Sequence, residues 1–287
     1  MDLLLNAVAA GILLGGFYAA VSIGLTICFG QLDIVNIAHP AFIVLGSFCT
    51  FILYEKLGID PILAGVAMTP VFFFIGLGLY STYYASFEKR GDESLRGLAF
   101  FFGIMFILEV ILILTFGVDY RMVETSYIGQ SLTLGVVGLP YRLLVPFIVS
   151  MAMAGGLYFY LSRTFTGRAI LAVAQDRLAL QLMGADPVRI KQIAFGIGLS
   201  TAAIAGAMLI MLGPVEPSIG RLYIGRVFAI VVLGGMTSIS GTLVAALILG
   251  VVESLVATYF GPSWSPAVAF GFLLVTLAIR PAGLFGR

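Results

Sequence analysis

The chain carries few charged residues. Of its 287 residues, only 10% are Asp, Glu, Lys or Arg, whereas 61% are hydrophobic. A soluble domain has about a quarter charged residues, so we predict that most of this surface faces lipid. The formal net charge is +1, which gives no reason to expect a nucleic-acid partner.

Histidine and cysteine are almost absent. The single histidine, His39, excludes a histidine cluster, and Cys28 and Cys49 lie in apolar runs without metal-ligand spacing. We predict that both cysteines pack as apolar side chains. The sequence contains no nucleophile–base set and no Gly-x-x-x-x-Gly-Lys-Ser/Thr phosphate loop. It therefore predicts that the chain is not an enzyme, binds no metal or cofactor, and does not itself hold ATP.

Long apolar runs are abundant. A helix needs about 20 apolar residues to cross a bilayer, and nine segments approach that length, with the seventh and ninth short. They are Leu3–Phe29, Val35–Tyr54, Pro61–Phe87, Gly97–Gly117, Tyr141–Leu161, Gln192–Leu212, Leu222–Thr237, Thr242–Phe260 and Pro266–Ile279. No basic region precedes the first run, so we expect it to be retained as a span. The predicted fold is an all-α, polytopic transmembrane bundle over residues 1–287, with nine spans, or eight if the seventh does not cross.

The lysines and arginines predict an orientation, because cytoplasmic loops are enriched in them. With nine spans, ten of the fifteen basic residues lie on one side and five on the other. The richer side holds Lys89, Arg90, Arg96, five in the segment 163–191, Arg280 and Arg287. We expect that side to be cytoplasmic, which places the C-terminus inside and the N-terminus outside. A re-entrant seventh segment would instead turn Arg280 and Arg287 outward.

Two loops on the other side are long. They are Val118–Pro140, which is glycine-rich and polar, and Gly213–Gly225, whose prolines are expected to end the sixth helix. They are candidates to receive a delivery protein, and the alternative is that they are ordinary connectors.

The segment 163–191 is the longest interruption of the apolar pattern. Leu171, Ala174, Leu178 and Leu182 recur at helical spacing, which predicts one helical face, with Gln175 and Asp176 outside it. Gly184 fits the end of this helix, and Asp186 before Pro187 fits the start of a second one. We predict a folded elbow that binds a soluble partner. The alternative is a helix lying on lipid headgroups, which is usually more basic than this one.

Four motifs in order resemble the permease subunits of branched-chain amino acid ABC importers. The first comprises Gly24-Leu25-Thr26 and Asp33 to His39, and the second runs from Gly167-Arg168-Ala169 through Ala174-Gln175-Asp176 to Gly184. The others are Val231 to Met236 and the tail Arg280-Pro281-Ala282-Gly283-Leu284-Phe285-Gly286. Ile37, Pro40 and Thr237 depart from the family pattern, which bears on substrate identity more than on family.

The resemblance implies a fold similar to vitamin B12-type importer permeases, in a bacterial inner membrane. It implies four partner subunits beside the lipid bilayer: a second homologous permease, two cytoplasmic ATP-binding subunits and a substrate-binding protein on the periplasmic or extracellular face. It also makes the segment 163–191 the ATPase-coupling loop, with Leu171, Ala174, Gln175, Asp176, Leu178, Leu182 and Gly184 as coupling residues. Whether the permease pair is a hetero- or a homodimer stays open.

Polar residues within the spans are candidates for the transport route, because charge in lipid is costly. Asp33, Asn36 and His39 lie at the turn between the first two spans, where Pro40 favours a helix start or kink. We predict that Asn36 and His39 line the route or its gate, and the alternative is that they cap a helix. Glu109 and Glu253 lie within spans; each either faces the route or is satisfied by a partner in the bundle, and the second interpretation is favoured.

Glycines at Gly11, Gly15, Gly16, Gly196, Gly198 and Gly206 predict close helix packing, either inside the chain or against the second permease. The function predicted is import of branched-chain or other hydrophobic amino acids, driven by partner ATPases. Urea, short amides and aromatic acids are alternative substrates. A stand-alone secondary transporter is the alternative mechanism, but Glu109 and Glu253 are its only mid-span carboxylates.

Overall fold

The computed structural model describes residues 2–90 and 94–286 and is a bundle of helices. Eleven α-helices are described: α1 Asp2–Leu25, α2 His39–Leu57, α3 Pro61–Ser86, α4 Ser94–Phe116, α5 Tyr141–Arg163, α6 Phe165–Val173, α7 Arg177–Leu182, α8 Pro187–Leu212, α9 Gly220–Gly234, α10 Ile239–Phe260 and α11 Ser265–Ile279. Three short turns of helix complete them: the π-helix η1 Thr26–Gln31 and the 3-10 helices η2 Glu88–Arg90 and η3 Pro262–Trp264. Within the described residues, eight helices are long and apolar enough to cross a membrane.

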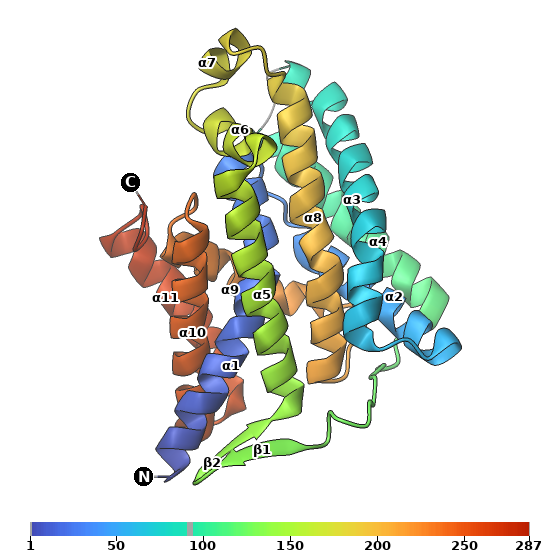
Figure 1. Ribbon diagram of the computed structural model, residues 1–287, viewed down its shortest axis with the longest axis vertical. Helices are drawn as coiled ribbons and strands as arrows, with labels where there is room; N and C mark the ends of the chain where they lie inside the picture. The colour runs from blue at the N-terminus through green and yellow to red at the C-terminus, as the bar shows by residue number, and fades with distance from the viewer. Residues whose placement is uncertain (1, 91–93, 287) are drawn as a thin grey trace.

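Helices α1 and α8 form the centre of the bundle. α8 packs along α3 and α2, and α1 packs along α10 and α5 (Figure 1). The α1–α10 contact depends on small residues: a methyl group on Gly15 would lie 2.7 Å from the Cα of Leu247, and one on Gly11 would lie 2.6 Å from the Cα of Val251. In a bilayer, the hydrophobic effect does not drive helices together, so they associate through close packing of their backbones at small residues. The glycines therefore serve packing inside this chain.

The two ends of the bundle differ. α1 begins at the end that carries the hairpin of β1 Ser131–Leu134 and β2 Val137–Pro140, whereas α6, α7 and the residues after α11 lie at the opposite end (Figure 1). The chain therefore crosses the bundle an odd number of times. This agrees with the parity predicted from nine spans.

The seventh crossing is made by a short helix. α9 has 15 residues, too few to span by itself, and it begins at Gly220, beside Pro40 and Ala41 at the start of α2. The predicted bounds of Leu222–Thr237 were wrong at both ends. Gly235, with φ +93, and the Met236–Thr237 turn end the helix early, and the helix starts at Gly220, two residues before the predicted start at Leu222.

The two long loops at the hairpin end are joined. Arg121 and Val215 exchange both backbone hydrogen bonds, at 2.9 and 2.8 Å. Tyr127 donates a hydrogen bond of 2.7 Å to Asp60, at the start of α3. Burial and this bond raise the pKa of Tyr127 to about 12, so its hydroxyl stays protonated at physiological pH. Hydrogen bonds therefore hold the two loops to each other and to the start of α3, so that they form a structured surface.

The chain after α11 folds back onto the opposite end. The backbone N–H of Leu284 donates to Leu233 at 2.8 Å and that of Phe285 donates to Gly234 at 3.3 Å. Gly283, with φ +78, makes the turn that this requires. The tail motif found in the sequence therefore closes the end of α9.

Candidate functional site: an elbow and a broken helix

The elbow, residues 163–186, is built from helix caps. The side chain of Thr164 accepts from the N–H of Gly167 at 3.0 Å and begins α6. Asp176 accepts from the N–H groups of Leu178 and Ala179, at 2.9 and 3.0 Å, and begins α7. Gly184, with φ +80, ends α7, as the sequence predicted.

The predicted single helix through Leu171 and Leu182 was wrong. Asp176 is extended (φ −151°, ψ 105°), as a helix cap requires, and this splits the segment into α6 and α7. Leu171 therefore packs against the core, whereas Ala174, Leu178 and Leu182 are exposed. The four residues do not share one face.

The outer side of the elbow is apolar although it lies beyond the ends of the spans. Leu182 and Met183 are 83% and 84% exposed, and Phe165 and Leu178 are also exposed. Between α6 and α7 lies a hollow of about 440 Å³, lined in part by Gln175, Asp176 and Met183. Exposed apolar groups around a hollow are typical of a protein-binding surface.

The elbow is connected directly to the most central helix. Asp186 accepts from the N–H of Val188 at 2.9 Å, and Pro187 begins α8. The second predicted helix is thus the start of a full span and not a short helix. One turn on, the ammonium group of Lys191 is buried and paired with the carboxylate of Glu88. Only residues 183–186 separate α7 from α8.

The backbone breaks where α1 meets α2. α1 changes to the π-helix η1 at Thr26, and residues 33–38 are not helical before α2 starts at His39. Asp33 is exposed and has φ +58, the one described residue other than glycine with a left-handed backbone. The predicted start of the second span at Val35 was four residues early, while the helix start at His39 and Pro40 was predicted correctly. π-helical turns recur at functional sites.

Asn36 and His39 are completely buried at this break. Neither the amide group of Asn36 nor the two ring nitrogens of His39 make a hydrogen bond of ordinary geometry. The Cys28 thiol lies beside Asn36, and the backbone of Val21 lies beside His39. Buried polar groups are normally paired, so these two call for an explanation in function.

The break lies against the middle of α8. A methyl group on Gly24 would lie 2.5 Å from the Cε1 atom of His39 and 2.3 Å from the Oγ1 atom of Thr201. A methyl group on Gly198 would lie 2.9 Å from the sulfur of Cys28. The helix that the elbow begins is therefore the helix against which the break is packed.

Glu109 and Glu253 both have partners. Arg221 Nε donates to Glu109 at 2.8 Å, and a second N–H of the same guanidinium donates to the other oxygen. Glu253 accepts from Arg226 Nε at 3.0 Å and from the hydroxyl of Tyr18. The sequence did not identify the partners of Lys191, Arg221 and Arg226, which count there only as basic residues. A basic residue inside or beside an apolar run was the signal that each needs a buried partner.

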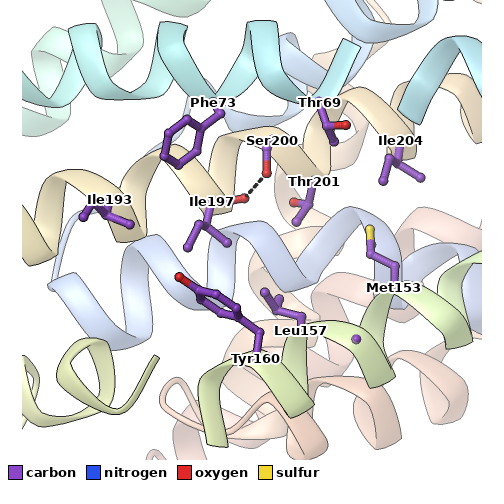
Figure 2. Close-up of a pocket in the computed structure, with 11 residues that line it drawn as sticks. Thr69, Phe73, Met153, Leu157, Tyr160, Ile193, Ile197, Ser200, Thr201 and Ile204 are labelled. Atoms are coloured by element: carbon purple, nitrogen blue, oxygen red, sulfur yellow. Dashed lines mark hydrogen bonds between the residues drawn. The ribbon is translucent and has the colours of Figure 1, made fainter. Parts of the chain in front are cut away.

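A groove runs along α8 between α3 and α5, with a volume of about 410 Å³ (Figure 2). Ile193, Ile197 and Ile204 of α8 line it opposite Leu157 and Tyr160 of α5. Ser200 and Thr201 donate their hydroxyls to carbonyls of their own helix, both at 2.7 Å. The groove suits an aliphatic chain better than a charged solute.

Comparison with known proteins gives a consistent answer over nearly the whole chain. Residues 7–277 match the family described as branched-chain amino acid transport system / permease component. The chain is 31% identical to the high-affinity branched-chain amino acid transport system permease protein BraD of Pseudomonas aeruginosa, over 99% of this chain and 96% of that protein. It is 29% identical to the permease protein LivH of Escherichia coli K12, over 96% of this chain and 94% of that protein.

A partial match extends to a second permease. The chain is 35% identical to the high-affinity branched-chain amino acid transport system permease protein LivM of Escherichia coli K12, over 41% of this chain and 28% of LivM. No solved structure matches.

Proposed function

The chain belongs to the branched-chain amino acid transport permease family, and from this we propose that it is a membrane subunit of an ATP-driven importer of branched-chain or other hydrophobic amino acids. It is a multi-pass membrane protein and, by family, a transport permease and not an enzyme. The partners in this proposal are a second permease, two ATP-binding subunits and a substrate-binding protein. LivH and LivM, two permeases named for one system, support a pair of different permeases.

The observation that carries the proposal is the capped, apolar elbow at one end of the bundle. A pair of ATPase subunits closing on ATP would press on α6 and α7 through Leu178, Leu182 and Met183. The caps at Asp176 and Gly184 keep the elbow folded under that load. Since α8 begins at Pro187, the displacement passes into the bundle without a flexible linker.

The break between α1 and α2 is the part of the bundle we propose as the gate. α8 packs against it through Gly198 and Thr201, so a shift of α8 changes the surroundings of Asn36 and His39. Their unpaired polar atoms are the cost of the present arrangement, and a second arrangement in which they meet partners or water would be close in free energy. Asp33 and Glu109 remain proposed residues of the route, whereas the buried ion pair of Glu253 with Arg226 supports the structural interpretation that the sequence favoured for Glu253.

The orientation proposed places the elbow and the chain after α11 in the cytoplasm of a bacterial cell, at its inner membrane. The end of α5 that carries Arg163 lies at the elbow end, whereas the start of α5, which carries Arg142, lies at the hairpin end (Figure 1). The tied loops at the hairpin end then face the delivery protein.

The test uses a matched pair of helix-cap variants in the co-expressed transporter. Asp176→Ala and Asp60→Ala each remove a cap, worth about 1 kcal/mol, at opposite ends of the bundle. We expect Asp176→Ala to reduce co-purification of the ATPase subunits and amino-acid uptake, and Asp60→Ala to leave the ATPase subunits bound. Equal co-purification and uptake in both variants would argue against the elbow, and uptake by the purified chain alone in liposomes would end the proposal.

A further inference from the structure

The ion pair of Glu109 and Arg221 is unlike the other buried pairs in its exposure. Half of the Arg221 side chain is exposed, at 50%, whereas that of Arg226 is 17% exposed and that of Lys191 is 3% exposed. Glu109 lies seven residues before the end of α4 at Phe116, which places it about 10 Å inside the bundle. A charged group is thus presented on the bundle's side at membrane depth.

The guanidinium of Arg221 is held inward. It makes two hydrogen bonds to Glu109, and its central carbon lies 5.1 Å from the ring centre of Phe106, one turn deeper in α4. Since a charge in contact with lipid is costly, this face of α4 and α9 is expected to meet water or a polar surface.

The remaining hydrogen-bond donors define what can bind there. A guanidinium has five N–H groups in a fixed plane, and Glu109 takes one from Nε and one from Nη2. The others are left for a second acceptor on the exposed side. A carboxylate matches this geometry best, because it accepts two parallel N–H groups.

We propose that Arg221 is the residue of this chain that contacts the carboxylate of the transported amino acid, and that Glu109 is the positioning residue that holds it. The inference rests on the proposed function. It places the α4–α9 face on the aqueous route between the two permeases. The groove between α3, α5 and α8 then lies away from the route.

The first arm of the test measures water access in the assembled transporter. Arg221→Cys, combined with Glu109→Gln so that no buried carboxylate is left unpaired, is compared with Ile148→Cys. Ile148 lies seven residues into α5, at a similar depth, and is 57% exposed. The wild-type protein, whose two cysteines are buried or half-buried, is the blank. We expect a charged, membrane-impermeant thiol reagent to label position 221 faster than position 148, because a charged reagent reaches a water-lined face and not a lipid-facing one. Equal or slower labelling at 221 overturns the inference.

The second arm distinguishes recognition of the amino-acid carboxylate by Arg221 from a structural ion pair that only holds α4 and α9 together. The exchange Glu109→Arg with Arg221→Glu keeps the ion pair but moves the positive charge to α4. We expect the exchanged protein to assemble and to hydrolyse ATP with its partners, while amino-acid uptake falls by about tenfold or more, since a charge-assisted contact is lost. Full uptake by the exchanged protein overturns the inference, because an ion pair that only holds α4 and α9 together would work in either orientation.

If the exchanged protein does not assemble, the uncharged pair Glu109→Met with Arg221→Met takes its place, with the same expected loss of uptake. A wild-type transporter that accumulates no amino acid would overturn the proposed function. Wild-type uptake together with full uptake by either double variant would overturn only the role of Arg221.

Discussion

At the scale of the residue, the carboxylates at Glu88, Glu109 and Glu253 each meet a basic side chain from a different element of the bundle. None is therefore available as a free coupling-ion site of the kind a secondary transporter needs. Glu253 is the most enclosed of them, since its side chain is 2% exposed, whereas those of Glu88 and Glu109 are each 8% exposed. Its oxygens accept from Arg226 and from Tyr18.

We expect Glu253→Gln to destabilise the protein by about 3 kcal/mol, because removing one member of a buried pair leaves the other unpaired. The measurement is thermal unfolding of the detergent-solubilised protein. Glu253→Met combined with Arg226→Met is the control and should cost less, since no charge is left alone. A Gln variant of unchanged stability that takes up no amino acid would instead place Glu253 on the route.

We expect His39→Ala to be made at the normal level and to lose most of its uptake. His39 makes no hydrogen bond of ordinary geometry, so its removal sacrifices packing and not a bonded network. Thr50→Ala is a comparison, because its hydroxyl is also buried without a partner in the same helix. Full transport by the His39 variant would remove the gate from this position.

The sequence could indicate that Asn36, His39, Glu109 and Glu253 were unusual, because polar groups stand out in apolar runs. It could not identify their partners. Arg221 lies 112 positions from Glu109 and Tyr18 lies 235 positions from Glu253, and no local pattern links such distances. The unpaired state of Asn36 and His39 likewise depends on α8, which is distant in sequence.

At the scale of the element, helix length and packing are governed by glycine. α1 and α10 approach closely at Gly15 and Gly250, whereas Gly155 of α5 has no atom within 4 Å of an added methyl group. The periodicity of apolar residues predicted most spans correctly, because lipid selects for length and hydrophobicity. It failed at α9 and at the elbow, where a left-handed glycine and an aspartate cap override hydrophobicity.

We expect Gly15→Ala to lower the thermal unfolding midpoint, because the methyl group would meet backbone atoms of α10 at 2.7 Å, and overpacking costs about 1–3 kcal/mol. Gly155→Ala is the matched control in a neighbouring helix and should be neutral or slightly stabilising. Equal midpoints for the two variants would mean that α1 and α10 move apart without cost.

At the scale of the whole molecule, the odd number of crossings separates the elbow from the hairpin. We expect a green fluorescent protein inserted after Gly184 to fluoresce, as it folds in the cytoplasm, and alkaline phosphatase inserted after Gly135 to be active, as it requires an oxidising exterior. Exchanging the two insertion sites gives the control and should silence both reporters. Activity of the exchanged pair would reverse the orientation and remove the elbow from the ATPase.

The glycine contact between α1 and α10 also sets an order of events during biosynthesis. Tyr18 and Glu253 are 235 positions apart, and a ribosome adds roughly 5–20 residues per second. Roughly ten to fifty seconds therefore pass between the synthesis of α1 and the synthesis of α10. During that interval the face of α1 that carries Gly11 and Gly15 must contact lipid or the insertion machinery in place of α10.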